Sequence, residues 1–409
     1  MTPLKLFEGI GIELEFMIVD TESLSVRPVA DELLKSVGGG YDLQVDLGPI
    51  AWSNELALHV IEMKCNGPVP TLSGLAGQFQ GHVERMRELL RPLSGMLLPT
   101  AMHPWMDPDR ELRLWPHEND VIYQTFDRIF DCRGHGWANL QSMHINLPFS
   151  NDDEFGRLHA AMRMILPILP ALAASSPLVE GKLTGLMDTR VDVYRTNARR
   201  IPRVSGLVIP EQVFTRADYE TKLLAPLYAD LAPHDPEGVL QHEWANARGC
   251  IARFERMAIE IRLLDLQEYP AADLAIAALV VGALKQLVGE SWSSSAVQRT
   301  FTEQRLASIL QDCVRDADQA SITDAEYLRA LGCTGEQRAG EVWRSIAERV
   351  QRVEPGFGEF EKALAVILDR GCLARRIASA VGPEPGRERL TAVYHEIATC
   401  LDRGQPFRG

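Results

Sequence analysis

The chain of 409 residues lacks the signals of several large protein classes. Its formal net charge is −14, so it has no excess of Lys and Arg with which to bind nucleic acid or an anionic membrane. Its seven cysteines include no Cys-x-x-Cys pair, which argues against a disulfide framework and a structural zinc site. The longest apolar run, residues 274–284, is shorter than the ~20 residues that span a bilayer.

Targeting and nucleotide-binding signals are also missing. The N-terminus has no long apolar run, so we expect no signal peptide and a cytoplasmic protein. The segment around Gly181 and Lys182 lacks the leading Gly and the Ser or Thr of a P-loop, and residues 38–40 (Gly-Gly-Gly) are typical of a turn rather than a dinucleotide cradle. Any nucleotide is therefore expected to be held through metal ions and arginines.

The sequence does contain short strands mixed with helices, which predicts an α+β fold. Two-residue alternation and Gly/Pro punctuation predict strands at 10–19, 42–47, 56–64, 97–102, 142–147 and 258–264. Helical spacing of apolar residues predicts helices at 75–90, 154–174 and 271–288. Pro167 and Pro170 predict a kink or an early end in the second helix. Residues 296–409 are predicted to form a helical region packed on a catalytic domain of residues 1–295.

The most informative segment is residues 11–16, in which a single leucine separates Glu13 from Glu15. Side chains alternate along a strand, so both carboxylates would project from one face. Two carboxylates this close repel each other unless a cation neutralises them, and hard divalent cations prefer oxygen ligands. The pair therefore predicts a metal site if other segments supply more ligands. The alternative is the solvated edge of an amphipathic strand.

A second pair of acids, Glu55 and Glu62, lies seven residues apart. In a continuous strand they would face opposite ways, so a bulge or turn near Glu55 is needed for them to converge. In a helix they would share a face with His59, similar to the Glu-x-x-His pairs of di-iron bundles. Val60 and Ile61 favour the strand. Solvated surface acids are the alternative to both.

Two further predicted strands carry polar residues at alternate positions. His144 and Asn146 share one face of the first strand. A lone histidine at such a position can be a metal ligand or a purely structural residue. Glu260 and Arg262 share one face of the second, which is otherwise apolar, and a charged pair there costs stability unless it has partners. The pair is either a structural salt bridge, or Glu260 binds a cation and Arg262 binds an anionic substrate group.

Together these segments supply six candidate hard ligands: Glu13, Glu15, Glu55, Glu62, His144 and Glu260. Such a set can hold two or three Mg²⁺ or Mn²⁺ ions, with water or nucleotide phosphates at the remaining positions. The strongest anion-binding candidate is the block of residues 188–200, which lies in an Arg-rich segment (188–203) predicted to be a loop. Guanidinium groups bind carboxylate or phosphate bidentately. The alternative is a solvated loop that pairs with the chain's own acids.

These elements occur in an order that resembles one known family, the glutamate–cysteine ligase type 2 or carboxylate–amine ligase family of the glutamine synthetase-like superfamily. The resemblance covers roughly residues 8–290. It implies a curved, mainly antiparallel sheet that forms a catalytic funnel, flanked by helices. This chain has Glu-Leu-Glu where common small members have Glu-Glu-Glu, so the resemblance leaves the exact substrates open.

The resemblance also implies a role for each candidate residue. One Mg²⁺ would be held by Glu15, Glu55 and Glu62. A second, which bridges to the γ-phosphate of ATP, would be held by Glu13, His144 and Glu260. The transferring phosphoryl group would be stabilised by Arg262, assisted by Arg190 and Arg195. Substrate or nucleotide would be bound by Asn146, Tyr194, Arg199 and Arg200.

The implied activity is that of an ATP-dependent ligase. A carboxylate would attack the γ-phosphorus of ATP to give a γ-glutamyl phosphate, and an amine would then displace phosphate to form an amide. Glutamate and cysteine are the default substrates, no nucleic acid or membrane partner is expected, and the family suggests a homodimer. The alternatives are a guanidino kinase-like phosphotransferase, a metal-dependent hydrolase that uses Glu55, His59 and Glu62, and a non-catalytic binding protein.

Overall fold

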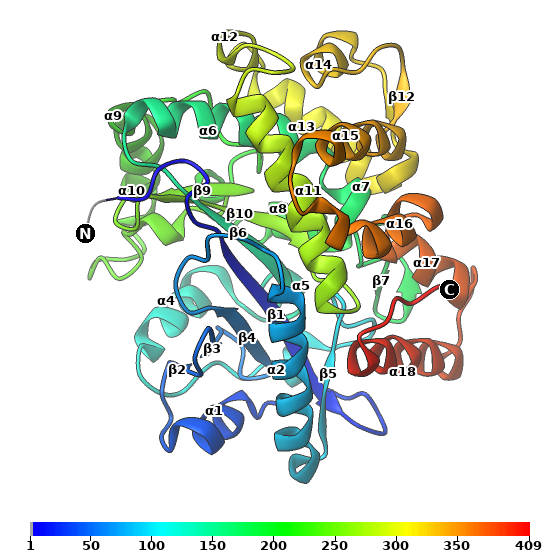
Figure 1. Ribbon diagram of the computed structural model, residues 1–409. Helices are drawn as coiled ribbons and strands as arrows, with labels where there is room; N and C mark the ends of the chain where they lie inside the picture. Colours follow the sequence, from blue (N-terminus) through cyan, green and yellow to red (C-terminus); the bar gives the residue numbers. More distant parts are fainter. Residues whose placement is uncertain (1–2) are drawn as a thin grey trace.

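The computed structural model describes residues 3–409, and its centre is an eight-stranded sheet (Figure 1). The strands are β1 (Gly11–Asp20), β2 (Gln44–Asp46), β3 (Ile50–Asn54), β4 (Val60–Cys65), β5 (Gly95–Leu98), β6 (Ser142–Pro148), β9 (Cys250–Arg253) and β10 (Ala258–Asp265). Their order is β2-β3-β4-β1-β6-β10-β9, with β5 paired to the C-terminal half of β1, and each of these pairs is antiparallel. The predicted α+β fold with a mainly antiparallel sheet is confirmed.

The strand predictions differ from the structure in several places, among them residues 97–102, where the strand β5 ends at Leu98. The segment predicted as a strand at 56–64 is a turn followed by β4, and the sequence pattern missed β3 and β9 altogether. All residues of these two missed strands are buried. Strands that are buried along their whole length show no apolar–polar alternation, so a rule based on two-residue periodicity cannot detect them.

One face of the sheet is apolar and packs on helices. Ile12, Leu14 and Phe16 on this face are fully buried in the main hydrophobic core. The covering helices are α2 (Leu75–Leu90), α6 (Asp152–Ile165) and α11 (Pro270–Val288), and α11 contacts both of the others. After α6 the chain forms a 3₁₀ turn (Leu166–Ile168) and the short helix α7 (Pro170–Ala173), so the predicted break at the prolines is confirmed.

Helix α11 is longer than the apolar run within it. Its 19 residues are long and apolar enough to cross a membrane by length and composition, which corrects the expectation drawn from residues 274–284. However, 83% of its most apolar window is buried against the rest of the chain. Its place at the centre of the helical layer explains the apolar composition (Figure 1).

The chain beyond residue 295 is mainly helical, as predicted. It contains α12 (Ser295–Gln298), α13 (Glu303–Asp316), β11 (Ser321–Ile322), α14 (Ala325–Ala330), β12 (Gln337–Arg338), α15 (Ala339–Val353), α16 (Glu361–Arg370), α17 (Leu373–Val381) and α18 (Arg387–Arg403). A Cβ added at Gly282 of α11 would lie 2.4 Å from Val350, so α15 approaches α11 closely. One hydrophobic cluster therefore includes residues from both sides of position 295, and a domain boundary there stays a prediction.

Shorter elements complete the fold and several of them lie over the polar face of the sheet. They are α1 (Ala30–Gly38), α3 (Pro108–Glu111), α4 (Asp120–Phe130), α5 (His135–Ala138), β7 (Leu178–Val179), β8 (Lys182–Leu183), α8 (Thr189–Thr196), α9 (Arg216–Tyr219), α10 (Ala225–Leu231) and the 3₁₀ turn η5 (Glu243–Ala245). The first half of the Arg-rich segment predicted to be a loop is thus the helix α8. Asp188 begins this helix, because its side chain accepts a hydrogen bond from the backbone N–H of Val191.

Candidate active site

Strand register brings the predicted polar residues together on the second face of the sheet. Glu13 of β1 lies opposite His144 of β6, and Glu15 lies opposite Glu62 of β4. Residues directly opposite each other in an antiparallel pair project from the same face, with Cβ atoms ~5 Å apart. Three strands therefore place four predicted ligands side by side.

The neighbouring strand β10 adds Glu260 and Arg262. The register of β10 against β6 shifts between Ile261 and Leu264, so two residues of β10 lie opposite His144. This bulge lets Glu260 and Arg262 project toward the polar face while the next residues, Leu263 and Leu264, are buried in the core. The Arg262 Nε atom lies 3.0 Å from Glu260 Oε1.

Glu55 reaches the site from the turn between β3 and β4. This is the turn that the strand interpretation requires, and the helical alternative for residues 55–62 is wrong. His59 is fully buried and its Nε2 lies 2.8 Å from the carbonyl oxygen of Ala138, so it does not join the carboxylates. The structure gives no support to a hydrolase site built on His59.

The ligand atoms form two overlapping groups, each within 4.8 Å. One group is Glu13, His144 and Glu260, and the other is Glu15, Glu62 and His144. The Nδ1 atom of His144 lies 3.1 Å from Glu13 and 3.5 Å from Glu260, whereas its Nε2 atom lies 3.7 Å from Glu15. The first group is the set that the resemblance implied for one ion.

The electrostatics of these groups fit a divalent cation. Burial and the charge of Glu13 raise the pKa of Glu62 to about 7. Burial and the charges of Glu15 and Glu62 raise the pKa of Glu55 well above its ordinary value. Crowded carboxylates with raised pKa values indicate negative charge that the surrounding cationic side chains neutralise only in part. Oxygen-rich donors of this kind suit Mg²⁺ and Mn²⁺, and a bound ion would relieve the repulsion.

Two candidate ligands, Glu13 and His144, form an ion pair with each other. Burial alone would lower the pKa of His144, but the hydrogen bond with Glu13 and the charges of Glu15 and Glu260 raise it to about 9. Burial would raise the pKa of Glu13, yet the hydrogen bond and charge of His144, together with the hydrogen bond from Glu62 and the charge of Lys64, lower this pKa. Asn146 does not line the cavity described below; its Nδ2 donates to Glu13 Oε1 at 3.0 Å.

Lys64 is a member of the site that the sequence pattern did not single out. It lies opposite Glu13 in the sheet, and its Nζ is 2.7 Å from Glu62 Oε2. Burial would lower the pKa of Lys64, but the charge of Glu62 raises it. Its position two residues after Glu62 on a strand is the signal that could have revealed it.

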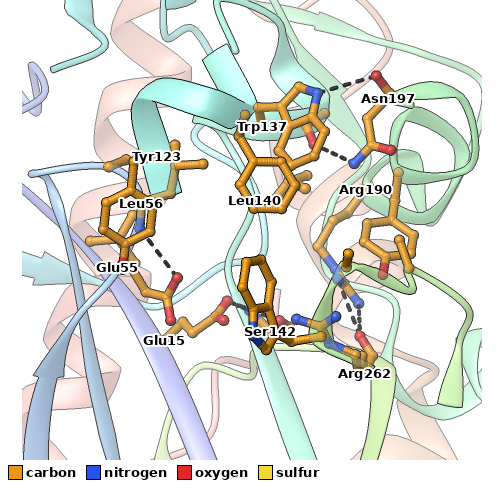
Figure 2. A pocket seen from close by; sticks show the side chains of 18 of the residues that line it. Glu15, Glu55, Leu56, Tyr123, Trp137, Leu140, Ser142, Arg190, Asn197 and Arg262 are labelled. Carbon is orange, nitrogen blue, oxygen red and sulfur yellow. Dashed lines mark hydrogen bonds between the residues drawn. The ribbon is translucent and has the colours of Figure 1, made fainter. Parts of the chain in front are cut away.

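The metal-type cluster opens into a cavity of about 350 Å³ (Figure 2). We call its polar base the floor, which consists of Glu15, Glu55, Ser142, His144 and Arg262. We call the apolar part of its lining the roof, which consists of Ile122, Tyr123, Phe126, Trp137, Leu140 and Trp244. Figure 2 shows Trp137 and Leu140 across the cavity from Glu15 and Ser142. The roof residues were not predicted from the sequence.

Helix α8 forms a third wall and explains which Arg-block residues reach the cavity. Arg190, Tyr194 and Asn197 line it, because spacings of four and three residues place them on one helical face. The Tyr194 hydroxyl and the Asn197 Oδ1 are shielded from solvent and have no hydrogen-bond partner within residues 3–409. Both are therefore available to a ligand.

The other three arginines of the block do not line the cavity, which corrects their predicted placement. Arg195 is exposed and pairs with Asp192 at 2.8 Å. Arg199 is exposed, and Arg200 donates to the carbonyl oxygen of Ile129. Arg195 lies five residues after Arg190 in α8, so at about 100° per residue it points to a different side of the helix, and Arg199 and Arg200 lie beyond the end of α8.

Arg190 and Arg262 differ in how far they are already neutralised. Arg190 is buried and its Nε lies 2.5 Å from Asp265, which also accepts hydrogen bonds from the Ser175 backbone and the Ser176 hydroxyl. Its terminal nitrogens lie near the carbonyl oxygen of Arg262 (Figure 2). Arg262 is more exposed, with 27% of its side chain accessible. Arg262 is thus the better placed of the two to contact a substrate anion.

Comparisons with known proteins agree with this architecture. The solved structure of a glutamate–cysteine ligase (gshA) from Francisella tularensis in complex with AMP matches with a TM-score of 0.60. That match has 12% sequence identity and covers all of this chain and 90% of that one, so it shows a shared fold. An uncharacterized protein of Archaeoglobus fulgidus is 31% identical over 97% of this chain and all of its own length.

Relatives with a named activity match over a shorter part. A Corynebacterium glutamicum (strain R) protein named "Putative glutamate--cysteine ligase 2" is 25% identical over 46% of each chain. The model of the glutamate–cysteine ligase family 2 (GCS2) matches residues 9–396, which is nearly the whole chain. This chain therefore belongs to the glutamate–cysteine ligase family 2.

Proposed function

We propose that this protein is an ATP-dependent carboxylate–amine ligase, which activates an acid as an acyl phosphate and joins it to an amine. The observation that carries the proposal is the convergence of carboxylates around His144 on one sheet face, where Glu15, Glu55, His144 and Arg262 line a cavity. Phosphoryl transfer requires positioning and charge neutralisation more than covalent chemistry, and this site is built for both. The family match supports the same activity.

The metal ligands divide between two ion positions. Glu13, His144 and Glu260 would hold one ion, and Glu15, Glu55 and Glu62 would hold the other. A bound Mg²⁺ or Mn²⁺ offsets the repulsion between an anionic nucleophile and a triphosphate. Lys64 and Asn146 hold Glu62 and Glu13 in place through the contacts described above.

In the first step, a carboxylate oxygen of the acid bonds to the γ-phosphorus of ATP while the bond from that phosphorus to the β–γ bridging oxygen breaks. ADP leaves and the acyl phosphate remains. The Arg262 guanidinium stabilises the charge on the transferring phosphoryl group, since it lies at the floor and keeps its charge at any working pH. Arg190 supports it from the adjacent wall.

In the second step, the amine nitrogen bonds to the acyl carbon, loses a proton, and inorganic phosphate leaves with the electrons of the C–O bond. Tyr194 and Asn197 would bind polar groups of the substrates, because both residues line the cavity and their side-chain oxygens have no hydrogen-bond partner in the described part of the chain, residues 3–409. The family name supplies glutamate and cysteine as the first pair of substrates to assay.

Hydroxylamine trapping tests the proposal. Hydroxylamine is a small nucleophile that converts an acyl phosphate to a hydroxamate, so ATP, Mg²⁺ and the correct acid should give hydroxamate and ADP in equal amounts. A guanidino kinase would form no hydroxamate, and a hydrolase would turn over without ATP. Absence of hydroxamate with glutamate and with a panel of other carboxylic acids would contradict the ligase assignment.

We also propose that the protein works on small molecules in the cytoplasm. All seven cysteines are free thiols in the structure, as expected for a reducing compartment. The homodimer suggested by the family stays a prediction, which sedimentation of the purified protein would test.

A further inference from the structure

The reaction proposed above assigns no role to the residues of the roof. Three separate segments build it: α4 supplies Ile122, Tyr123 and Phe126, the region of α5 supplies Trp137 and Leu140, and η5 supplies Trp244. None of these side chains carries a charge. Phosphoryl transfer uses none of them, so their function must concern a part of the substrates that does not react.

The aromatic rings of the roof are held in place by mutual contacts. The ring centroid of Phe126 lies 5.2 Å from that of Trp137 and 5.9 Å from that of Trp244. Phe130 supports Trp137 from behind at 5.5 Å. All three lining rings are only half-buried although the molecule has a large core. A rigid apolar surface that faces a cavity is prepared to bind an apolar group.

The space that remains in the cavity during the second step places one substrate against this surface. Phosphate must leave toward the floor, where the metal ligands and Arg262 lie. The amine attacks a face of the acyl carbonyl, and because the ions and the phosphate take up the floor side of the acyl carbon, the amine is left the part of the cavity that the roof lines. The group attached to the amine nitrogen then lies among the aromatic rings, whereas the acid remains beside the charged residues.

We infer that the amine substrate carries an aromatic or large aliphatic group, and this inference rests on the proposed ligase function. The thiol-bearing side chain of cysteine is small and would leave much of the roof uncovered. A phenyl group would cover it and remove more apolar surface from water, which favours binding by a factor of about ten or more.

The experiment compares amines after the acid has been identified by hydroxylamine trapping. With that acid, ATP and Mg²⁺, ADP release is measured over a range of concentrations of 2-phenylethylamine, L-phenylalanine and L-cysteine. The better of the two aromatic amines should exceed L-cysteine in kcat/KM by about tenfold or more. An equal or higher kcat/KM for L-cysteine would overturn the inference while hydroxamate formation still upheld the ligase.

Variants test whether the roof is responsible. Trp244→Ala should reduce the aromatic-to-cysteine ratio of kcat/KM about tenfold, and Trp244→Phe should retain most of it. Trp244 is preferable to Trp137, whose Nε1 donates to the Asn197 carbonyl oxygen at 3.2 Å. The matched control is Trp292→Ala, a half-buried tryptophan that stacks on Arg349 far along the chain and does not line the cavity.

The outcomes separate the two proposals. An unchanged ratio in Trp244→Ala, or an equal loss in Trp292→Ala, would overturn the assignment of the roof as the amine site. If no acid yields a hydroxamate, the ligase proposal fails first and the amine assignment fails with it. A preference for aromatic amines that Trp244→Ala removes and Trp244→Phe keeps would support the inference.

Discussion

The floor and the roof of the cavity face each other across the same space but are built in different ways. The floor consists mainly of charged residues held by the register of hydrogen-bonded strands. The roof consists of aromatic and aliphatic residues from three short segments that meet only in the folded chain. Under the proposed function, the floor carries out the reaction and the roof selects the amine substrate.

This difference follows from the physics of the two parts. Carboxylates that must converge within a few ångströms need a rigid scaffold, and a central sheet provides it. An apolar surface needs only shape and area, so short helices and turns can supply it. Changes to the floor should therefore affect chemistry and stability, and changes to the roof should affect the preference among amines.

The largest effect should come from the floor. Glu15→Gln removes one negative charge from the ion site without changing the size of the side chain. ATP turnover that depends on metal should fall by about a thousandfold or more, since loss of a key electrostatic group costs this much in comparable sites. ADP release measures this, and circular dichroism should show an intact fold. Glu84→Gln, on the exposed face of α2, is the matched control; near-normal activity in Glu15→Gln would refute the metal assignment.

Two arginines of α8, Arg190 and Arg195, form ion pairs, and comparing them tests which side of this helix faces the cavity. Arg190→Gln breaks a buried pair with Asp265 and should lower the free energy of unfolding by ~3 kcal/mol, because a buried carboxylate loses its counter-charge. Arg195→Gln breaks an exposed pair with Asp192 and should cost less than ~1 kcal/mol. Urea unfolding of both variants measures the difference.

Turnover should follow the same order in these two variants. Arg190→Gln should lose most activity, while Arg195→Gln should remain close to the unmodified protein. A severe loss of turnover in Arg195→Gln alone would show that this arginine reaches the substrate during the reaction.

A smaller effect is expected in the pH dependence of metal stabilisation. The pKa of Glu62 is raised from 4.5 to about 7, and that of His144 from 6.5 to about 9, in the ion-free protein. The folded state thus binds more protons than the unfolded chain in these windows, and ion-free stability falls as the pH rises from 6 to 9. The lowered pKa of Glu13 acts only below pH 4.5.

Mg²⁺ binds the deprotonated ligands, so its stabilising effect should grow over the same range. The increase in Tm caused by Mg²⁺ should be larger at pH 8 than at pH 6, by an amount on the order of a few °C. Differential scanning fluorimetry with and without Mg²⁺ measures it. A gain in Tm that is the same at both pH values would indicate that Mg²⁺ binds elsewhere.

The smallest effect should come from a conservative change in the roof. Phe126→Leu keeps an apolar side chain but removes a ring that packs against Trp137 and Trp244. The KM for an aromatic amine should rise about two- to tenfold, which corresponds to the binding free energy lost with one aromatic pair contact. Phe360→Leu in the C-terminal region is the control. An increase in the KM for ATP rather than for the amine would assign the roof to the nucleotide.

The difference between the floor and the roof also explains which parts of the site could be predicted from the sequence. Strands repeat every two residues, so the spacing alone assigns Glu13 and Glu15, or Glu260 and Arg262, to one face of a strand. Convergence of the four strands was implied by the resemblance to a family, not by the periodicity. The roof could not be predicted, because nothing in the sequence links Phe126 to Trp244 across more than a hundred residues.

The prediction for the Arg-rich segment was wrong for a different reason. In a loop, as predicted, every arginine is equally available to an anion. Helix α8 has mixed composition and only eight residues, so its helical period was hard to detect. Once the period is known, Arg190 and Tyr194 fall on the cavity side and Arg195 on the solvent side.

The position of His144 between the two ligand groups has a consequence for metal selectivity. A neutral imidazole has one lone pair, and its second nitrogen carries a proton. If Nδ1 binds an ion together with Glu13 and Glu260, Nε2 must donate a hydrogen bond toward Ser142. The two ion positions are then unequal, one with a nitrogen ligand and one with oxygens alone. We expect Zn²⁺ to compete for the first and to leave the second to Mg²⁺.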